Sequence, residues 1–285
     1  MSENKSIRHS VIAGSWYPGD AVVLKKQLSD FLSAVENGEE KQDVFALIVP
    51  HAGYIYSGKT AAHAFKLVEG QEFERVIITS PFHAPATEAF LTTTFEQYET
   101  PLGRITVDQE GLGQLNKYLS AHHVPMIESV RGEHEHSLEI ELPFLQVALS
   151  ESFEVVPVMV RTQKANWLKV LGEGLAELAH NRKTLLVAST DLSHFYEAKS
   201  AKLMDERVFQ YIEAMSPMEL LDGNKRGHAQ ACGAGAVAAV LWAAHAAGAT
   251  EARVLYYSHS GMVTGDDSSV VGYGAAVILK GKKTD

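Results

Sequence analysis

The feature that most constrains the fold is a run of six apolar residues, Val44–Val49, that no polar residue interrupts. A strand with one exposed face alternates apolar and polar residues, whereas a strand buried on both faces reads as a continuous apolar run. Similar short runs recur at 76–79, 155–160 and 185–188, with helical spacing of apolar residues between them, as at 166–180. The pattern predicts an α/β fold with a central, mostly parallel or mixed sheet flanked by helices.

Capping and turn residues predict further elements around this sheet. Asp20 can cap a helix whose apolar residues begin at Leu24, and Ser57 is expected to cap a helix that runs to Val68. Two apolar segments on either side of a turn at 100–103 predict a hairpin. The remaining expected elements are hairpin strands at 90–94 and 105–107, a helix at 197–215 and closing strands at 253–257 and 270–279.

Residues 227–250 contain no Asp, Glu, Lys or Arg, and as a helix they would be long enough to span a bilayer. They are mostly Ala and Gly, however, and include His228 and His245, which is typical of a close-packed buried helix. We therefore expect no membrane partner. No tandem repeat or change of composition marks a boundary, so residues 1–285 are predicted to form one domain.

The charge and the cysteine content indicate which binding partners and which cellular compartment to expect. Lys and Arg number 25 against 35 Asp and Glu, and the net charge of −10 has the wrong sign for tracking nucleic-acid phosphates. We expect no nucleic-acid partner. The single cysteine, Cys232, allows no intrachain disulfide, and the first ten residues lack the apolar core of a secretion signal, which favours the cytoplasm.

Histidines follow three of the predicted strands. His51 comes after the first apolar run, His83 after the second, and Asp191 with His194 after the last. Taken singly, such a histidine is more often a hydrogen-bonded loop residue, and Asp191 can equally be a helix N-cap. Because the carboxyl ends of neighbouring parallel strands meet at one edge of a sheet, the coincidence at three strand ends favours a metal site.

Two further segments carry metal-binding side chains. Cys232 precedes the Ala-rich helix, where the helix dipole favours thiolate, although a free cysteine is often a buried packing residue. In an extended segment His134 and His136 would share a face that can bind metal, but a solvated loop is the more typical setting for His134, and His136 receives no role. Phosphate-binding loops, dinucleotide glycine patterns and Gly-x-Ser-x-Gly elbows are absent from the sequence.

Six motifs occur in a characteristic order along the chain. They are Gly14-Ser-Trp-Tyr-Pro18, Pro50-His-Ala-Gly-Tyr54 with Ser57-Gly58, Tyr98-Glu-Thr-Pro-Leu-Gly103, Glu135-His-Ser137 with Leu142-Pro143, Ser189-Thr-Asp-Leu-Ser-His194 and Val270-Val-Gly-Tyr273. In identity and order they resemble those of the Memo family, and the likeness extends from Arg8 to Leu279. Microbial members are often called protein B of the AmmeMemoRadiSam system, and the family resembles class III extradiol dioxygenases of the LigB type, which bind non-heme Fe(II) through two histidines and a glutamate.

The resemblance implies a LigB-like fold with His51, His83 and Cys232 as metal ligands. It places Asp191 and His194 in the same pocket as catalytic residues, and His194 would be an acid–base group. The third position holds cysteine instead of glutamate, and a soft thiolate suits copper or zinc better than an Fe(II)–oxygen site.

Three functions follow from this ligand set, and the sequence leaves open whether the protein is an enzyme. The first is a mononuclear iron or copper pocket, with zinc as a further option, that performs redox or oxygen-dependent chemistry on a small molecule. The second is a binding protein that recognises a metabolite or peptide in the same pocket without turnover. The third is an extradiol dioxygenase.

Overall fold

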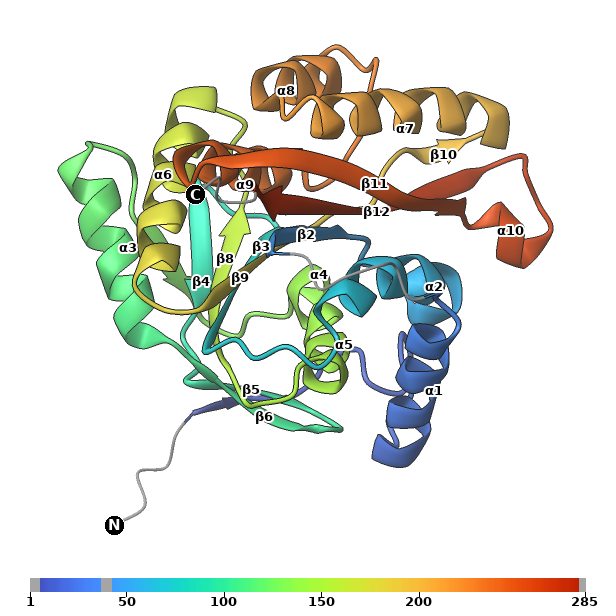
Figure 1. Ribbon diagram of the computed structural model, residues 1–285, viewed down its shortest axis with the longest axis horizontal. Coiled ribbons are helices and arrows are strands. Elements are labelled where there is room, and N and C mark those ends of the chain that lie inside the picture. The colour runs from blue at the N-terminus through green and yellow to red at the C-terminus, as the bar shows by residue number, and fades with distance from the viewer. Residues whose placement is uncertain (1–5, 37–42, 282–285) are drawn as a thin grey trace.

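The four apolar runs form the centre of a mixed sheet in the computed structural model, which describes residues 6–36 and 43–281. Strands β8 (Glu154–Val160), β3 (Arg75–Pro81), β9 (Thr184–Ser189) and β2 (Val44–Val49) lie side by side in that order and are parallel. Almost all of their residues are buried, as their lack of alternation predicts. The α/β prediction with a central sheet is confirmed (Figure 1).

Shorter and antiparallel strands extend the sheet on both sides. The order of the longest path is β1-β5-β6-β8-β3-β9-β2-β12-β10, with β11 paired to β12 and with β4 joining β8 to β7. These outer strands are β1 (Ile7–Arg8), β4 (Phe90–Thr93), β5 (Gln97–Thr100), β6 (Gly103–Val107), β7 (Ile127–Val130), β10 (His194–Tyr196), β11 (Ala249–His259) and β12 (Val270–Lys280).

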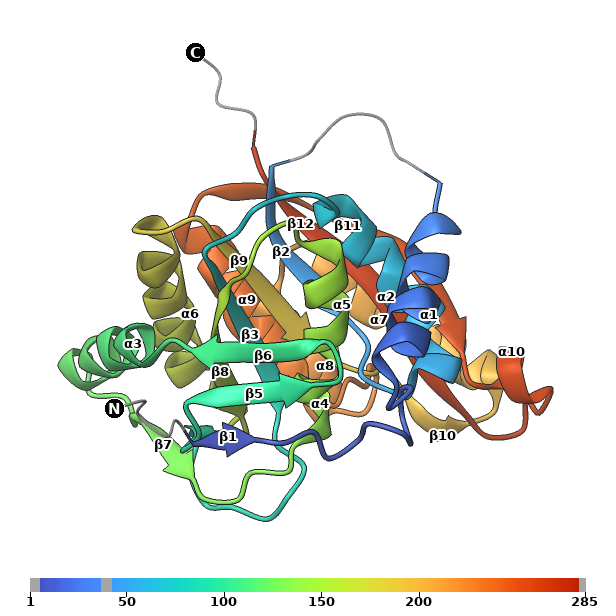
Figure 2. The same cartoon turned by 90° about the horizontal axis from the view of Figure 1, so that it is seen from below.

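Helices cover both faces of the sheet (Figures 1 and 2). Helix α9 packs on β3, β9 and β2 with α6 behind it, and α2 packs on β2, β11 and β12 with α1 beside it. The helices are α1 (Ala21–Ser33), α2 (Tyr54–Phe65), α3 (Gln109–Ala121), α4 (His136–Glu139), α5 (Glu141–Ala148), α6 (Ala165–His180), α7 (Ala198–Glu213), α8 (Pro217–Lys225), α9 (Ala234–Ala246) and α10 (Gly261–Thr264), with a 3-10 turn η1 (Lys66–Val68).

The Ala-rich segment forms α9, which is buried from Ala234 to Ala244 as predicted. Its small residues let α6 approach closely, because a Cβ atom on Gly172 of α6 would lie 2.5 Å from the backbone oxygen of Ala239. Among the helices of residues 6–36 and 43–281, none has the length and apolar character needed to cross a bilayer.

Two of the local predictions about helices are confirmed and one is wrong. Asp20 does cap α1, accepting hydrogen bonds from the backbone of Val22 and Val23. Ser57 is not a cap: α2 begins at Tyr54, and the Ser57 hydroxyl donates to the carbonyl of Ala52 inside the first turn. The helix expected at 197–215 is confirmed as α7, and a separate short helix, α8, follows it with Pro217 at its start.

The predicted hairpin has the right turn but the wrong first strand. Residues 100–103 do join two antiparallel strands, yet these are β5 and β6, whereas β4 pairs with β7 and β8. Strand β5 alternates half-buried and buried residues and contains no apolar run. Its pattern is that of a half-exposed strand, which a search for continuous apolar runs overlooks.

Candidate metal centre

Three neighbouring parallel strands each deliver a polar side chain to the same edge of the sheet, two residues past the strand end. Strand β2 ends at Val49 and is followed by His51, β3 ends at Pro81 before His83, and β9 ends at Ser189 before Asp191. The groups meet: the backbone N–H of His51 donates to Asp191 Oδ1 at 2.8 Å, and the rings of His51 and His83 are 5.4 Å apart.

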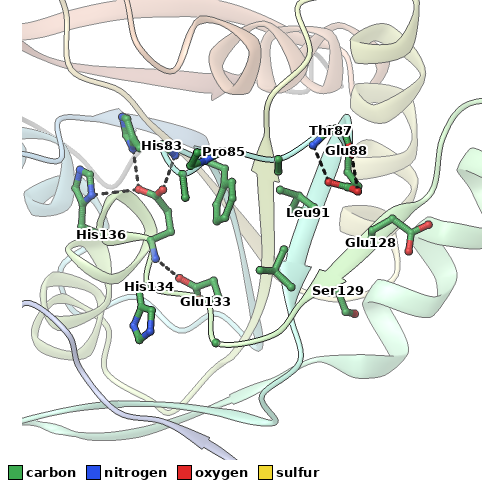
Figure 3. Close-up of a pocket in the computed structure, with 16 residues that line it drawn as sticks. His83, Pro85, Thr87, Glu88, Leu91, Glu128, Ser129, Glu133, His134 and His136 are labelled. Atoms are coloured by element: carbon green, nitrogen blue, oxygen red, sulfur yellow. Dashed lines mark hydrogen bonds and ion pairs between the residues drawn. The ribbon is translucent and has the colours of Figure 1, made fainter.

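A third imidazole, that of His136, completes a cluster with His51 and His83. One ring nitrogen from each lies within 4.8 Å of the others, a spacing that a single metal ion can bridge. His136 is the first residue of α4 and turns toward His83, whereas His134 is exposed and points away (Figure 3). Sequence reasoning assigned His136 no role, although its position in the Glu135-His-Ser137 motif was an available signal.

One carboxylate anchors both His83 and His136. Glu135 Oε1 lies 2.8 Å from His83 Nδ1 and 3.3 Å from His136 Nδ1, and Oε2 accepts the backbone N–H of His83. Burial opposes ionisation of Glu135, yet the hydrogen bonds from His83 prevail and lower its pKa to about 2. The same contact raises the pKa of His83. This wall of the site is ionic.

Behind Glu135 lies a buried network centred on Arg8 of β1. The Arg8 guanidinium donates to both carboxylate oxygens of Glu133, at 2.8 and 3.1 Å, and to the carbonyl of Glu135 at 2.9 Å. It also forms an ion pair with Glu139. Because Arg8, Glu133 and Glu139 are all almost inaccessible to solvent, each charge depends on the others for compensation. The N-terminal strand thereby holds the segment that carries His136.

The Nδ1 atom of His51, in contrast, meets an uncharged hydroxyl group. His51 Nδ1 lies 2.9 Å from the hydroxyl oxygen of Ser189, which is 2.7 Å from Glu141 Oε1. Burial lowers the pKa of His51 well below its ordinary value and raises that of Glu141 well above it. Burial thus favours the uncharged form of both groups.

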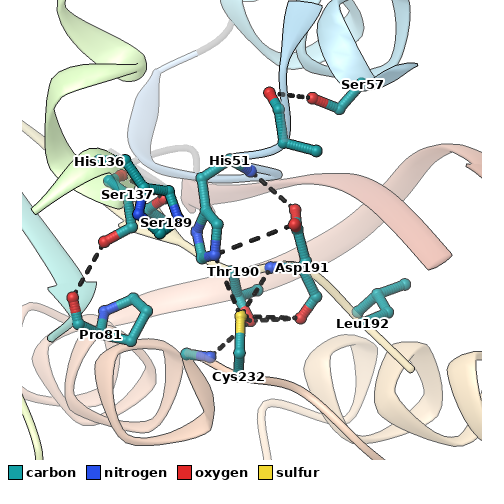
Figure 4. A network of polar contacts seen from close by, with 12 residues as sticks. His51, Ser57, Pro81, His136, Ser137, Ser189, Thr190, Asp191, Leu192 and Cys232 are labelled. Atoms are coloured by element: carbon teal, nitrogen blue, oxygen red, sulfur yellow. Dashed lines mark hydrogen bonds and ion pairs between the residues drawn. The ribbon is translucent and has the colours of Figure 1, made fainter. Parts of the chain in front are cut away.

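Cys232 lies against the other nitrogen of His51, with Sγ 3.2 Å from Nε2 (Figure 4). It precedes Gly233, the N-cap of α9, and the backbone N–H of Asp191 donates to its sulfur at 3.2 Å. Burial, followed by the charge of Asp191, raises the pKa of the Cys232 thiol, so the pocket favours the thiol over the thiolate that its position suggests. Its place as a metal ligand stays a prediction.

Asp191 and His194 line the same pocket. Residues 190–193 form no helix in the structure, so the capping alternative for Asp191 is wrong. Burial raises the Asp191 pKa to about 7, against hydrogen bonds from the His51 and Ala52 backbone. His194 Nδ1 lies 2.7 Å from the carbonyl oxygen of Leu192, which can only accept, so Nδ1 carries the proton and Nε2 is a free base. Their catalytic roles stay predictions.

The cluster opens into two cavities that share His83 and His136. One, of about 980 Å³, extends along the 82–91 and 128–136 segments (Figure 3). The other, of about 460 Å³, also contains His51, Asp191 and His194, and none of the residues described as lining it is Lys or Arg. Its remaining lining residues are Ser15, Trp16, Ala52, Gly53, Ile55, Tyr56, Val271 and Tyr273.

The three histidines fit a mononuclear transition-metal ion. Neutral imidazole is a common ligand of zinc, iron and copper. In metal sites the second ring nitrogen of a ligating histidine is usually held by a carboxylate or another polar group. Here Glu135 holds Nδ1 of His83 and His136, and Ser189 holds Nδ1 of His51, so that three Nε2 atoms are free of these anchors.

Several relatives of this chain are named as MEMO1 family proteins. A MEMO1 family protein of Nitrosopumilus maritimus is 34% identical over 279 residues, covering 94% of this chain and 98% of the relative. MEMO1 family proteins of Methanopyrus kandleri and Aquifex aeolicus are each 34% identical and cover 96% of this chain and 99% of their own length.

The fold is shared with a crystal structure of the uncharacterized protein JW3007 from Escherichia coli K12. The two agree with a TM-score of 0.55 over 82% of this chain and 99% of the other, at 17% sequence identity. The Memo-like protein family itself matches residues 8–277. The match covers the strands and loops that form the site, and this chain belongs to the Memo family.

Proposed function

We propose that this chain binds one iron or copper ion, with zinc as a further option, and uses it in redox or oxygen-dependent chemistry on a small molecule. The observation that carries the proposal is the convergence of ring nitrogens from His51, His83 and His136 within 4.8 Å. The proposal includes Cys232 as a further ligand, and its support is the 3.2 Å distance between Cys232 Sγ and His51 Nε2. A bound ion would supply a Lewis-acid and redox centre.

Asp191 and His194 would handle protons beside the ion. The Nε2 of His194 can accept a proton, because its Nδ1–H is already donated to the carbonyl of Leu192. Asp191, with a pKa of about 7, can hold or release a proton near neutrality. Both face the 460 Å³ cavity, where a substrate would lie.

The cavity walls favour an uncharged, largely apolar small molecule. Trp16, Ile55, Tyr56 and Tyr273 supply apolar surface, and the described lining contains no Lys or Arg to pair with a carboxylate or phosphate. The net charge of −10 also argues against a nucleic-acid partner. The cytoplasmic location expected from the single cysteine belongs to the same proposal.

A binding protein without turnover is the second candidate. Phe195, next to His194, is 76% exposed, and Ile55 at the cavity is 69% exposed. Apolar side chains at the edge of a pocket can contact a peptide that extends beyond it. An extradiol dioxygenase is a third candidate, and exposure of the Fe(II)-loaded protein to catechols and oxygen tests it through ring-opened product.

The ligand set is tested by metal analysis of protein purified without oxygen or chelators. We expect His51→Ala, His83→Ala and His136→Ala each to lose most of the metal. The control is His134→Ala, because His134 lies two residues from His136 but is exposed, and this variant should keep the metal. Cys232→Ser should weaken Cu(I) most, because a hydroxyl is a poor substitute for sulfur. Equal loss from all four histidine variants, or from none, contradicts the site.

A further inference from the structure

The hydroxyl oxygen of Ser189 lies within hydrogen-bond distance of three polar atoms. They are His51 Nδ1 at 2.9 Å, Glu141 Oε1 at 2.7 Å and the carbonyl oxygen of Ser137 at 2.8 Å. Ser189, Glu141 and Ser137 are at most 1% exposed and His51 is 2% exposed. Ser189 and His51 lie together in Figure 4, close to Ser137. Because these residues are shielded from water, the contacts among them determine which atom carries each proton.

Counting protons leaves one arrangement in which all three contacts are hydrogen bonds. A serine hydroxyl has a single proton to donate and two lone pairs with which to accept. The carbonyl of Ser137 can only accept, so it takes the Ser189 proton. The other two contacts then require donors, which are a protonated Glu141 and the Nδ1–H of His51. If Glu141 were ionised, two of the oxygens would face each other at under 3 Å without a proton between them.

We propose that Glu141 is a positioning residue that stays protonated and, through Ser189, locks His51 in the Nδ1–H tautomer, leaving Nε2 as the metal-binding atom. The inference rests on the proposed metal site and extends it to two residues that do not touch the ion. Glu141 lines neither of the two cavities and reaches His51 only through the Ser189 hydroxyl.

Independent contacts agree with this tautomer. With Nδ1 protonated, His51 Nε2 carries a lone pair, and the neutral thiol of Cys232 can donate to it across their 3.2 Å contact. Burial raises the pKa of Glu141, which is the direction that a neutral acid requires. His51 Nε2 therefore presents the lone pair of a neutral imidazole to the metal site.

The first test reads protonation in the metal-free protein. In ¹⁵N-histidine-labelled wild type, we expect the His51 signal of the Nδ1–H tautomer. Infrared difference spectra between wild type and Glu141→Gln should show a protonated-acid carbonyl band that shifts in D₂O. The control is Glu219→Gln, which removes an exposed carboxylate from α8. A missing acid band, or a His51 signal from the Nε2–H tautomer, overturns the proposal.

The second test uses metal affinity and a rescue. Glu141→Gln keeps a neutral N–H donor to Ser189, so we expect its affinity for Zn²⁺ and Fe²⁺ within about threefold of wild type, while Glu141→Leu and Ser189→Ala lose about 10- to 100-fold. Circular dichroism identifies any variant that fails to fold. If the Gln variant is as weak as the Leu variant, Glu141 does not act as a neutral donor. If wild type binds no metal although the acid band and tautomer are present, the proposed function fails and the protonation assignment stands.

Discussion

The two walls of the metal centre hold their histidines by opposite means. On the His83–His136 wall an ionised Glu135 is backed by Arg8, Glu133 and Glu139. On the His51 wall the ring nitrogens meet the Ser189 hydroxyl, with Glu141 behind it, and the Cys232 thiol, while Asp191 accepts the backbone N–H. The ionic wall joins segments that are far apart in the chain: the His83–Glu135 contact spans 52 positions and the Arg8–Glu133 contact spans 125. The difference teaches that equivalent ligands within one site can depend on quite different interactions.

Removing the cation of the ionic wall should have the largest effect, and this effect is on the free energy of unfolding. Arg8→Met leaves Glu133 and Glu139 buried without their cation, and removing one partner of a buried ion pair typically costs about 3–5 kcal/mol. We expect a loss of this size in the free energy of unfolding, measured with urea. Arg104→Met, which breaks an exposed pair with Glu99, serves as the control and should lower the free energy of unfolding far less, because solvent screens that pair. Similar losses in the two variants would contradict the network.

Removing Glu135, the carboxylate that contacts both His83 and His136, should have the second-largest effect, and this effect is on metal affinity. Glu135→Ala releases Nδ1 of both His83 and His136, so we expect metal affinity to fall by about 100-fold, at the upper end for residues behind a ligand. Isothermal titration with Zn²⁺ measures the change. The control is Glu128→Ala, which removes an exposed carboxylate from the same large cavity and should leave affinity unchanged. A loss from Glu128→Ala as large as that from Glu135→Ala would mean that net cavity charge, not anchoring, sets affinity.

The smallest effects, of opposite sign, should appear in the pH dependence of stability. Burial opposes ionisation of Glu139, but Arg8 prevails and lowers its pKa, so its stabilisation is present above the ordinary value of 4.5 and is lost as the pH falls. Burial raises the pKa of Glu141, so its stabilisation is present below 4.5 and is lost as the pH rises.

Replacing each acid by its amide separates these contributions. Relative to wild type, Glu139→Gln should flatten the decline in urea stability on the acid side, and Glu141→Gln should flatten the decline on the alkaline side. Urea midpoints measured from about pH 3 to about pH 8 provide the comparison. Slopes that change in the same direction for both variants would show that the walls do not differ in charge.

Much of the fold was predictable because burial leaves a local pattern. Continuous apolar runs identified β2, β3, β8 and β9, and composition alone identified α9 as a buried helix. Strand β5 was missed because a half-exposed strand has no such run. That residues 1–285 form one domain stays a prediction.

The sequence by itself determined that His51, His83 and Asp191 meet, because parallel strands bring their carboxyl ends to one edge. Only the tertiary structure decided that His136 joins them, since its segment is held in place by Arg8, more than 120 residues away. It also decided that hydrogen bonds from His83 lower the pKa of Glu135 while burial raises that of Glu141. Glu135 and Glu141 lie six positions apart and have the same side chain, so the sequence alone does not distinguish their pKa values. The groups around each carboxyl that affect its pKa belong to segments distant in the chain, such as those of His83 and Ser189, and a local sequence pattern does not reveal them.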